Sequence, residues 1–333
     1  MKVIVPMAGM GKRLRPHTLS IPKPLIPVAG KSIVERLVED IAAITGEQLE
    51  EVAYITGRFG EEVEKDLIAV AERLGAKGRI CYQDQALGTA HAILCAAESL
   101  EGHVTVAFAD TLFIADFKPD PTVDGVLWVQ RIPNPEQFGV VKLDDQGNIS
   151  DFVEKPKTFV SDLAMIGIYS FKDGAALRTE LQYLIDNNIM NSGEYQLPDA
   201  LRNMMKKGMK FAVGLVEDWM DCGNKEATVD TNKKVLEYNK HLPMIDKSAI
   251  LQNSTVLQPC YIGAGVEIHN SVVGPYVSIG KGTKVSSSII KNSIIQNDCE
   301  LINMQIKDSM IGRSVKAQNM NGDFSLGDYS EIK

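Results

Sequence analysis

The chain has 333 residues, a hydrophobic content of 44% and a formal net charge of −8 at pH 7. This length predicts one large domain and a smaller one, and the acidic balance argues against a general nucleic-acid-binding surface. The first apolar run is short and interrupted by Pro6, and no later stretch is apolar for long enough to span a bilayer. The five cysteines form no CxxC pair, so we expect reduced thiols in a cytoplasmic protein.

The first predicted strand, Val3 to Met7, leads into a loop rich in glycine and cations. The strand is short and β-branched, as in a buried parallel strand. Gly9 and Gly11 let the backbone approach a ligand closely, and free N–H groups there form a concavity for an anion. Four cations follow with no acidic residue among them: Lys12, Arg13, Arg15 and Lys23. A polyphosphate fits this composition better than a solvated surface turn does.

Two familiar phosphate-binding motifs are excluded by the residues of this loop. A P-loop requires serine or threonine after Gly-Lys, and the chain has Arg13 there. The dinucleotide fingerprint requires a third glycine where the chain has Leu14. Pro16 argues against a helix that runs straight out of the loop. We therefore predict a long basic loop.

Strands and helices alternate after the loop. We predict helices over 32–44, 61–74 and 89–100, and strands over 51–56, 79–83 and 103–109. This alternation predicts right-handed βαβ units and a mostly parallel sheet. Ligands of such sheets bind beyond the carboxyl ends of the strands, where Gly9, Gln83 and Asp110 would lie.

The pattern then changes to closely spaced strands, which predict an antiparallel insertion. These strands cover 125–130, 139–143, 149–153 and 164–171. Helices over 174–188, 196–207 and 225–240, with a strand over 210–216, complete the first predicted domain.

Aliphatic residues recur about every six residues beyond Pro243, as at Ile250, Val256, Ile262 and Ile268. This hexapeptide period predicts a left-handed parallel β-helix of about four coils, whereas a β-sandwich would alternate with period two. We therefore predict an α/β fold of two domains. A Rossmann-like domain with a mixed, mostly parallel sheet covers 1–242, and a short left-handed β-helix covers 243–333.

The basic loop resembles the signature of a known enzyme family. Gly9-x-Gly11-x-Arg13-Leu14-x-Pro16-x-Thr18, followed by Pro22-Lys23-Pro24-Leu25, is similar to the loop of the sugar-1-phosphate nucleotidylyltransferases, or NDP-sugar pyrophosphorylases. The resemblance covers residues 1 to about 240 and is closest to glucose-1-phosphate thymidylyltransferases and UTP-using long forms with a β-helix tail. It implies Mg²⁺-dependent transfer of a nucleotidyl group from dTTP or UTP to glucose 1-phosphate, with release of pyrophosphate.

Two carboxylates are candidates for the magnesium ion. Asp110 follows a predicted buried strand, and Asp221 lies in the turn Trp219-Met-Asp-Cys-Gly223. Either residue alone could be an ordinary turn or N-cap aspartate. The resemblance implies that both hold the metal, and that Arg13 and Lys23 stabilise the phosphates during transfer.

The segment after Gln83 is the candidate for base recognition. A side-chain amide can both donate to and accept from the edge of a base. The resemblance implies that the nucleoside contacts six residues: Ala8, Gly9, Gly11, Gln83, Gly88 and Thr89. Within the family, glutamine at this spacing is similar to the thymine- and uracil-using members, although the Leu-Gly-Thr-Ala sequence that follows overlaps that of guanine-using members.

The resemblance also implies four sugar-phosphate contacts: Gly139, Glu154, Lys155 and Met165. A carboxylate suits sugar hydroxyl groups and an ammonium group suits the sugar phosphate. Seen alone, Glu154-Lys155 is more often a solvated pair at a turn. Of the five histidines, we expect His17 to be exposed in the loop, and His269 is the one histidine within the repeats.

Three alternative functions remain open. The enzyme could transfer guanylyl groups to mannose 1-phosphate. It could also be a bifunctional N-acetylglucosamine-1-phosphate uridylyltransferase and acyltransferase, although the lone His269 argues against acyl transfer. It could be a non-catalytic regulatory subunit, but such subunits usually lose the arginine, the lysine or the aspartates that this chain retains. We assign the β-helix to contacts in a homo-oligomer. The base, the sugar, a feedback site and the number of subunits stay open.

Overall fold

The computed structural model describes residues 1–9, 11–117, 120, 122–145 and 147–333. The chain forms two compact units. The first contains Met1–Gly9 and Glu35–Trp219, and the second contains Met10–Val34 and Met220–Lys333. The predicted boundary after residue 242 therefore falls inside the second unit. Met10, within the predicted nucleotide-binding loop, lies outside the described residues.

The first unit is built on a mixed sheet that has nine strands among the described residues. These strands are β1 (Lys2–Pro6), β4 (Glu51–Thr56), β5 (Lys77–Tyr82), β6 (Val104–Ala107), β8 (Gly125–Arg131), β9 (Gly139–Leu143), β10 (Ile149–Glu154), β11 (Leu163–Phe171) and β12 (Phe211–Leu215). The order across the sheet is β10-β9-β11-β6-β1-β4-β5, and β8 pairs with both β11 and β12. Two further strands of the chain are β7 (Thr111–Ile114) and β13 (Asp218–Asp221).

The parallel part of the sheet confirms the predicted alternation. β1 pairs in parallel with both β4 and β6, and β4 pairs in parallel with β5. The chain leaves β1 for β4 on one side and later returns to β6 on the other. β1 and β6 therefore flank the point where the strand order reverses, which is where open α/β sheets bind ligands.

The predicted antiparallel strands are also confirmed, and they extend the same sheet. β9 pairs with β10, and β11 pairs with β8, all antiparallel. β11 is in addition antiparallel to β6, with Ile168 opposite Ala107. This pairing joins the antiparallel strands directly to the parallel ones.

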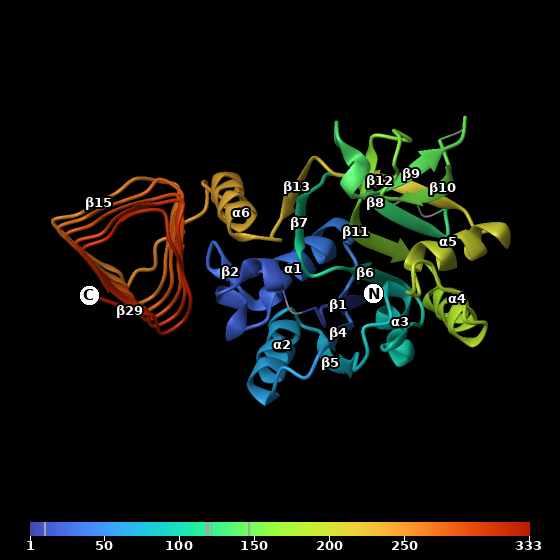
Figure 1. Cartoon of the computed structure of the whole chain (residues 1–333), viewed down its shortest axis with the longest axis horizontal. Coiled ribbons are helices and arrows are strands. Elements are labelled where there is room, and N and C mark those ends of the chain that lie inside the picture. The colour runs from blue at the N-terminus through green and yellow to red at the C-terminus, as the bar shows by residue number, and fades with distance from the viewer. Residues whose placement is uncertain (10, 118–119, 121, 146) are drawn as a thin grey trace. The chain divides into compact units, whose positions relative to one another are not determined.

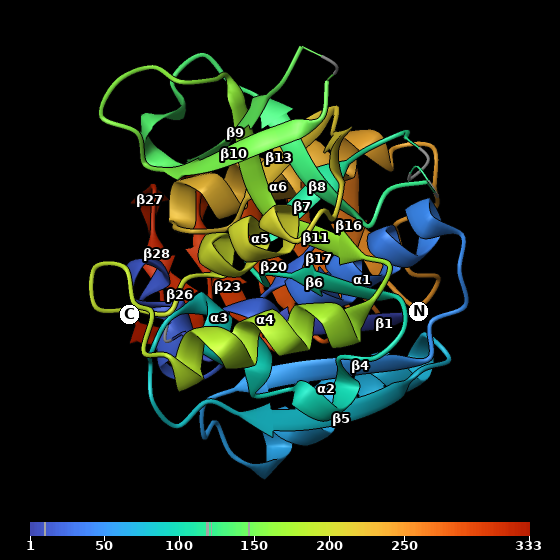
Figure 2. The ribbon, with the colours of Figure 1, turned by 90° about the vertical axis from the view of Figure 1, so that its right-hand side faces the viewer.

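Five helices accompany this sheet: α1 (Ile33–Thr45), α2 (Glu61–Arg73), α3 (Thr89–Leu94), α4 (Gly174–Asp186) and α5 (Leu197–Lys206). α2 packs against β5, while α3, α4 and α5 pack on one another (Figure 2). The helix predicted over 89–100 ends early, at Leu94, and a 3₁₀ turn covers Ala97–Ser99. In that turn the buried Ser99 hydroxyl donates to the Glu51 carboxylate at 2.5 Å.

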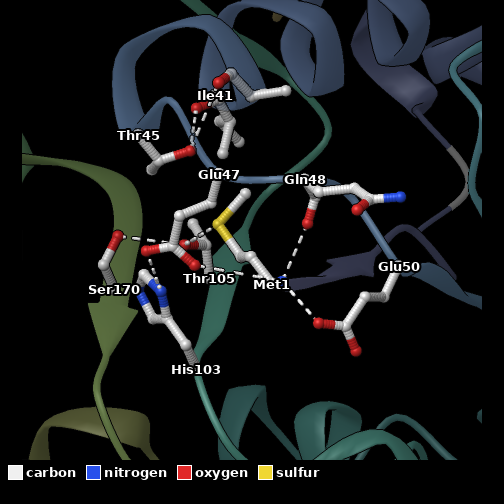
Figure 3. Close-up of polar contacts among 10 residues, drawn as sticks. Met1, Ile41, Thr45, Glu47, Gln48, Glu50, His103, Thr105 and Ser170 are labelled. Carbon is white, nitrogen blue, oxygen red and sulfur yellow. Dashed lines mark hydrogen bonds and ion pairs between the residues drawn. The ribbon is translucent and has the colours of Figure 1, made fainter.

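Several polar groups of the first unit are paired (Figure 3). The hydroxyl groups of Thr105 in β6 and Ser170 in β11 lie 3.0 Å apart. The Met1 amine donates to the Gln48 carbonyl at 2.9 Å and to the Glu50 carboxylate at 3.0 Å. For the buried hydroxyl groups and the buried amine, such pairing offsets the cost of desolvation.

The second unit contains a β-helix whose strands form three parallel sheets. The first sheet is β14 (Ile250–Gln252), β17 (Glu267–His269), β20 (Lys284–Ser286), β23 (Glu300–Ile302), β26 (Lys316–Gln318) and β29 (Glu331–Ile332). The second is β15 (Thr255–Val256), β18 (Val272–Val273), β21 (Ile289–Lys291), β24 (Gln305–Lys307) and β27 (Asn321–Gly322). The third is β16 (Cys260–Ile262), β19 (Val277–Ile279), β22 (Ser293–Ile295), β25 (Met310–Ile311) and β28 (Ser325–Leu326).

These coils have a triangular outline in Figure 1 and are consistent with the predicted left-handed β-helix. Within 243–333, where every residue is described, five complete coils precede β29. The prediction of about four coils was therefore wrong. The repeat continues past Ile311 through Ala317 and Gly322, which stand where Leu301 and Ile306 stand in the coil before and therefore hide the aliphatic pattern.

The pairing register also corrects the start of the repeat. Ile268 stacks on Leu251, whereas the predicted position Ile250 points outward and is 53% exposed. The aliphatic columns form the core of this unit, as the hexapeptide period predicts. Asparagines such as Asn253 and Asn270 occupy the corners with positive φ, which asparagine tolerates better than most residues.

The remaining elements of the second unit come from both ends of the chain. They are the 3₁₀ helices η1 (Lys12–Leu14), η2 (His17–Leu19) and η3 (Lys23–Leu25), the short strands β2 (Pro27–Val28) and β3 (Lys31–Ser32), and the helix α6 (Lys225–Tyr238). The absence of a long helix after Gly11 agrees with the effect expected of Pro16. Among the helices formed by described residues, none combines the length and apolarity needed to cross a membrane.

Candidate functional site

Three predicted residues of the first unit lie at one edge of its sheet. Gly9 follows β1, Gln83 follows β5 and Asp110 follows β6. Because these strands run parallel, their carboxyl ends share one edge, as predicted. Gly9 is exposed, and a Cβ built on it would meet no atom within 4 Å. The backbone there is open to a ligand.

The side chain of Gln83 is held in one orientation by its neighbours. Its amide nitrogen lies 3.3 Å from the Gly88 carbonyl oxygen and 3.2 Å from His91 Nδ1. A carbonyl can only accept, so the NH₂ group must face it and Oε1 is turned away. Burial lowers the pKa of His91, which favours the neutral ring. Nδ1 accepts in the tautomer that carries its proton on Nε2. His91 was not among the predicted site residues.

Gly88 is required by close packing. Its φ is 108°, and a Cβ there would stand 2.4 Å from the Tyr195 carbonyl oxygen. The backbone of Tyr195 pairs with both Leu87 and Ala90, which fixes the turn that enters α3. The hydroxyl of Thr89 accepts from the Leu197 N–H at 2.9 Å, at the start of α5. These contacts fix the position of Gly88, whose carbonyl oxygen binds the Gln83 amide.

The predicted sugar-phosphate residues lie on β9, β10 and β11. Gly139 is paired with Glu154, whose backbone the structure describes. Lys155 follows with φ 43°, and its N–H donates to the Phe138 carbonyl at 3.1 Å. Its exposed side chain therefore emerges from a sharp bend at the end of β10.

Met165 is buried at the start of an irregularity in β11. The pairing with β8 shifts between Met165 and Tyr169, and Gly167 within this bulge has φ +85°. The Gly167 carbonyl accepts from the Phe108 N–H at 3.0 Å. Phe108 comes two residues before Asp110, so the bulge adjoins the turn that carries this carboxylate. Bulges of this kind often lie beside functional sites.

In the second unit, Gly11 adopts a conformation that favours glycine. Its φ is +56°, and a Cβ there would stand 3.1 Å from both Lys23 Cβ and Thr18 Cγ2. The Thr18 hydroxyl donates to the Gly11 carbonyl at 2.9 Å. Gly11, Thr18 and Lys23 therefore pack together, and the loop folds back on itself.

Arg13 and Asp221 lie beside each other across Gly223. A Cβ built on Gly223 would stand 2.9 Å from Asp221 Oδ2 and 3.2 Å from Arg13 Nη2. The Asp221 carbonyl accepts from the Thr231 hydroxyl of α6 at 2.8 Å, which anchors the turn. Gly223 is part of the turn motif Trp219-Met-Asp-Cys-Gly223, which could have pointed to its role. It was nevertheless not among the residues predicted for the site.

The expectation that His17 is exposed was wrong. Its side chain is 0% exposed, and Nε2 lies 3.1 Å from the Ser325 hydroxyl oxygen. Nδ1 is buried without a hydrogen-bond partner among the described residues. Burial lowers the pKa of His17 to about 4, against a smaller raising effect of Asp328, and Lys225 adds to the lowering.

The candidate metal ligands have suitable chemistry. Asp110 and Asp221 supply carboxylate oxygens, which Mg²⁺ prefers. No group of three or more His, Cys, Asp or Glu side chains with metal-binding geometry occurs within the described part of the chain. Mg²⁺ commonly keeps several waters and substrate phosphate oxygens with only one or two protein carboxylates. The donor set therefore fits this ion without a further protein ligand.

Comparisons with known proteins agree with the fold and the loop motif. Residues 2–238 match the nucleotidyl transferase family. Glucose-1-phosphate thymidylyltransferase of Streptomyces antibioticus is 28% identical and is aligned over 100% of this chain and 99% of its own. Bifunctional protein GlmU of Methanocaldococcus jannaschii is 28% identical over 96% of this chain and 78% of its own.

A solved structure supports the same fold. A putative glucose-1-phosphate thymidylyltransferase from Bacillus anthracis has a TM-score of 0.58 at 23% identity, over 69% of this chain and 93% of that one. The family match covers well over half of the sequence, including the basic loop, Asp110 and Asp221. The chain belongs to the nucleotidyl transferase family, and it is a nucleotidyltransferase.

Proposed function

We propose that this enzyme transfers a thymidylyl or uridylyl group from dTTP or UTP to glucose 1-phosphate, with Mg²⁺ as cofactor. One observation within the first unit carries the proposal: Gly9, Gln83 and Asp110 follow three parallel strands at one edge of the sheet. This edge offers an open backbone, an oriented amide and a carboxylate, the groups that a nucleoside triphosphate and its metal require. Family membership supports the same reaction class.

The chemical step would be an in-line displacement at the α-phosphorus. A phosphate oxygen of the sugar phosphate forms a bond to this phosphorus, the bond to the bridging oxygen breaks, and pyrophosphate leaves with the electron pair. No covalent enzyme intermediate is needed. When bound, Mg²⁺ would offset the negative charge on the phosphates, with Asp110 and Asp221 as its protein ligands.

The basic residues would act on the two phosphate-bearing substrates. Arg13 would stabilise the transferring and leaving phosphates, and Lys23 would hold phosphate oxygens as charge develops. Lys155 would position the attacking phosphate, while Gly139, Glu154 and Met165 would contact the sugar. Pre-organisation of this kind lowers the barrier because the charges need not reorient during reaction.

The orientation of Gln83 is compatible with the proposed bases. With its NH₂ group directed at Gly88 and His91, Oε1 would accept from an N–H group of the base. Thymine and uracil supply N3–H. Guanine supplies N1–H, which keeps guanylyl transfer to mannose 1-phosphate as the second candidate. Gly88 and Thr89, with the backbone of Ala8, Gly9 and Gly11, would hold the rest of the nucleoside.

The other components of the proposal concern location and assembly. We propose a cytoplasmic homo-oligomer assembled through the β-helix, with a nucleoside triphosphate and a sugar 1-phosphate as its partners. Exposed aliphatic side chains such as Leu251 and Ile302 on the β-helix support such contacts. Mass measurement of the protein in solution tests the assembly.

A pyrophosphate-release assay tests the reaction. Five nucleotides (ATP, GTP, CTP, UTP and dTTP) are each incubated with glucose, mannose and N-acetylglucosamine 1-phosphate in Mg²⁺ buffer. We expect the greatest activity with dTTP or UTP and glucose 1-phosphate, and loss of activity in Asp110→Asn and Arg13→Ala. Release with GTP and mannose 1-phosphate alone would select the second candidate. No release with any pair would contradict both and favour a regulatory subunit.

Acyl transfer is tested separately with acetyl-CoA. The ring of His269 faces Gln252 and Glu267 of its own sheet, with Nδ1 3.0 Å from Gln252 Oε1 and Nε2 3.6 Å from Glu267 Oε2. Because both ring nitrogens have these partners, we expect no turnover of acetyl-CoA.

A further inference from the structure

One face of the β-helix differs from the other two. On the sheet of β16, β19, β22, β25 and β28, one residue of each strand points outward: Tyr261, Ser278, Ile294, Met310 and Ser325. The three central members are almost fully buried, with exposures of 4%, 1% and 0%. Outward residues of the first sheet, such as Lys284 and Glu300, are exposed. Other parts of the second unit therefore cover this one face.

The covering segments are α6 and the basic loop. Asn232 of α6 accepts from the Ser278 hydroxyl at 2.7 Å and from the Ala29 N–H at 2.9 Å. Gly30 lies on the ring of Tyr261, since a Cβ there would stand 2.2 Å from Cε2. The end of the loop is thus fixed to the first two coils.

The middle of the loop is fixed to the last complete coil. Nε2 of His17 lies 3.1 Å from the Ser325 hydroxyl oxygen, and the Ser20 hydroxyl donates to Asp328 at 2.7 Å. Pro16 rests on Gly327, where a Cβ would stand 3.0 Å from Pro16 Cβ. Asp328 is itself held by Arg313, whose N–H and Nε both donate to it at 2.8 Å. The loop therefore runs along this face from the last coil to the first.

The basic residues that the proposed reaction uses flank these anchors. Pro16 comes three residues after Arg13, and Ser20 comes three residues before Lys23. Between them, the Thr18 hydroxyl donates to Gly11. A shift of the anchored segment would therefore be passed to Gly11, Arg13 and Lys23 through a short piece of backbone.

We propose that the last coil of the β-helix positions the phosphate-binding loop for catalysis. Ser325, Gly327 and Asp328 are positioning residues that act on Arg13 and Lys23 through Pro16, His17 and Ser20. This role rests on the proposed nucleotidyl transfer and adds to the oligomer contacts assigned to the β-helix. It also accounts for the buried neutral His17, which a solvated loop would not require.

Gly327→Ala tests the role most directly, because it adds one methyl group against Pro16. We expect kcat to fall by about tenfold or more, since small displacements of catalytic groups are costly. KM for the sugar phosphate stays within about twofold, because the sugar-phosphate residues lie on other elements.

Further variants grade the effect. Ser325→Ala gives a smaller decrease of kcat than Gly327→Ala. Asp328→Asn keeps an oxygen acceptor for Ser20, so its kcat falls less than that of Asp328→Ala. Glu331→Gln, an exposed change in β29, leaves kcat unchanged.

Hydrogen–deuterium exchange gives a readout that does not depend on turnover. We expect faster exchange in the peptide over residues 11–25 of Gly327→Ala, with unchanged exchange in β17, β20 and β23. If the wild-type enzyme releases no pyrophosphate, the proposed reaction fails, and exchange alone decides whether the coil holds the loop. Unchanged exchange in 11–25, or faster exchange with wild-type kcat, overturns the positioning role. Loss of exchange protection across the whole β-helix would also overturn it, because the effect would then be general destabilisation.

Discussion

Single residues in this protein are fixed by contacts that are distant in sequence. Gly223 separates the side chains of Asp221 and Arg13, which are more than 200 residues apart in the chain. A glycine is needed there because any Cβ would press on the carboxylate and on the guanidinium. The residue contributes no functional group, yet it determines where two charged groups can lie.

Substitution of Gly223 by alanine tests this spacing. The new methyl group would lie 2.9 Å from Asp221 Oδ2 and 3.2 Å from Arg13 Nη2, so both side chains must move. We expect kcat/KM to fall about 100-fold, the order of magnitude for a displacement of about 1 Å. Glu226→Gln, at an exposed position in the first turn of α6, is the control and keeps wild-type activity. Wild-type activity in Gly223→Ala would show that the spacing is unimportant.

The burial of His17 predicts a pH dependence of stability. Its pKa is about 4 in the folded chain, against about 6.5 when unfolded, and the charged groups that act on it are Asp328 and Lys225. As the pH falls below 6.5, His17 is protonated in the unfolded chain before it is protonated in the folded chain. The free energy of unfolding therefore decreases as the pH falls from 6.5 to 4. Between pH 7.5 and pH 5 this loss amounts to about 2 kcal/mol.

The variant His17→Gln isolates this contribution, because its side chain does not titrate. Urea unfolding followed by circular dichroism is measured for both proteins at pH 7.5 and pH 5. We expect the free energy of unfolding to fall by about 2 kcal/mol more in the wild type than in the variant. Equal losses in both proteins would mean that His17 is protonated in the folded chain at pH 5.

At the scale of elements, the regular patterns were predictable and their ends were not. Both patterns, the alternation of strands and helices and the six-residue period, arise because each element must bury one apolar face. α3 ends early, and the 3₁₀ turn after it carries a hydrogen bond between Ser99 and Glu51, 48 residues apart. The burial of His17 depends on Ser325, 308 residues away. Local sequence contains no sign of such partners.

The strand β21 offers a matched pair of residues for testing the β-helix core. Ile290 is 0% exposed and stacks between Val273 and Ile306, whereas its neighbour Ile289 is 42% exposed. We expect Ile290→Ala to lower the free energy of unfolding by about 2–5 kcal/mol, through lost burial and the cavity left behind. Ile289→Ala removes the same atoms from a partly solvated position, and we expect a loss below about 1 kcal/mol. Equal effects in a urea titration would contradict the register.

At the scale of the whole molecule, the candidate site residues are divided between the two units. Gln83, Asp110 and Lys155 belong to the first unit, and Arg13, Lys23 and Asp221 to the second. The sequence predicted these residues from family motifs, which are read along the chain and do not depend on how it folds. It did not predict that residues 11–34 would fold with the β-helix, because those contacts depend on side chains from the last coil.

Asp110 and Asp221 are proposed to hold one magnesium ion, and a double-mutant cycle tests this proposal. We expect Asp110→Asn and Asp221→Asn each to lower kcat by about 10³-fold or more, which is typical of lost electrostatic stabilisation in the transition state. If both act through one ion, the double variant falls little further, because residues that act as a unit are not additive. Chelation by EDTA abolishes wild-type activity with an unchanged circular dichroism spectrum, and added Mg²⁺ restores it. Fully additive losses would exclude a shared ion, because the effects of two independent roles multiply. Activity that persists in EDTA would also exclude it, because a metal-free reaction needs neither carboxylate as a metal ligand.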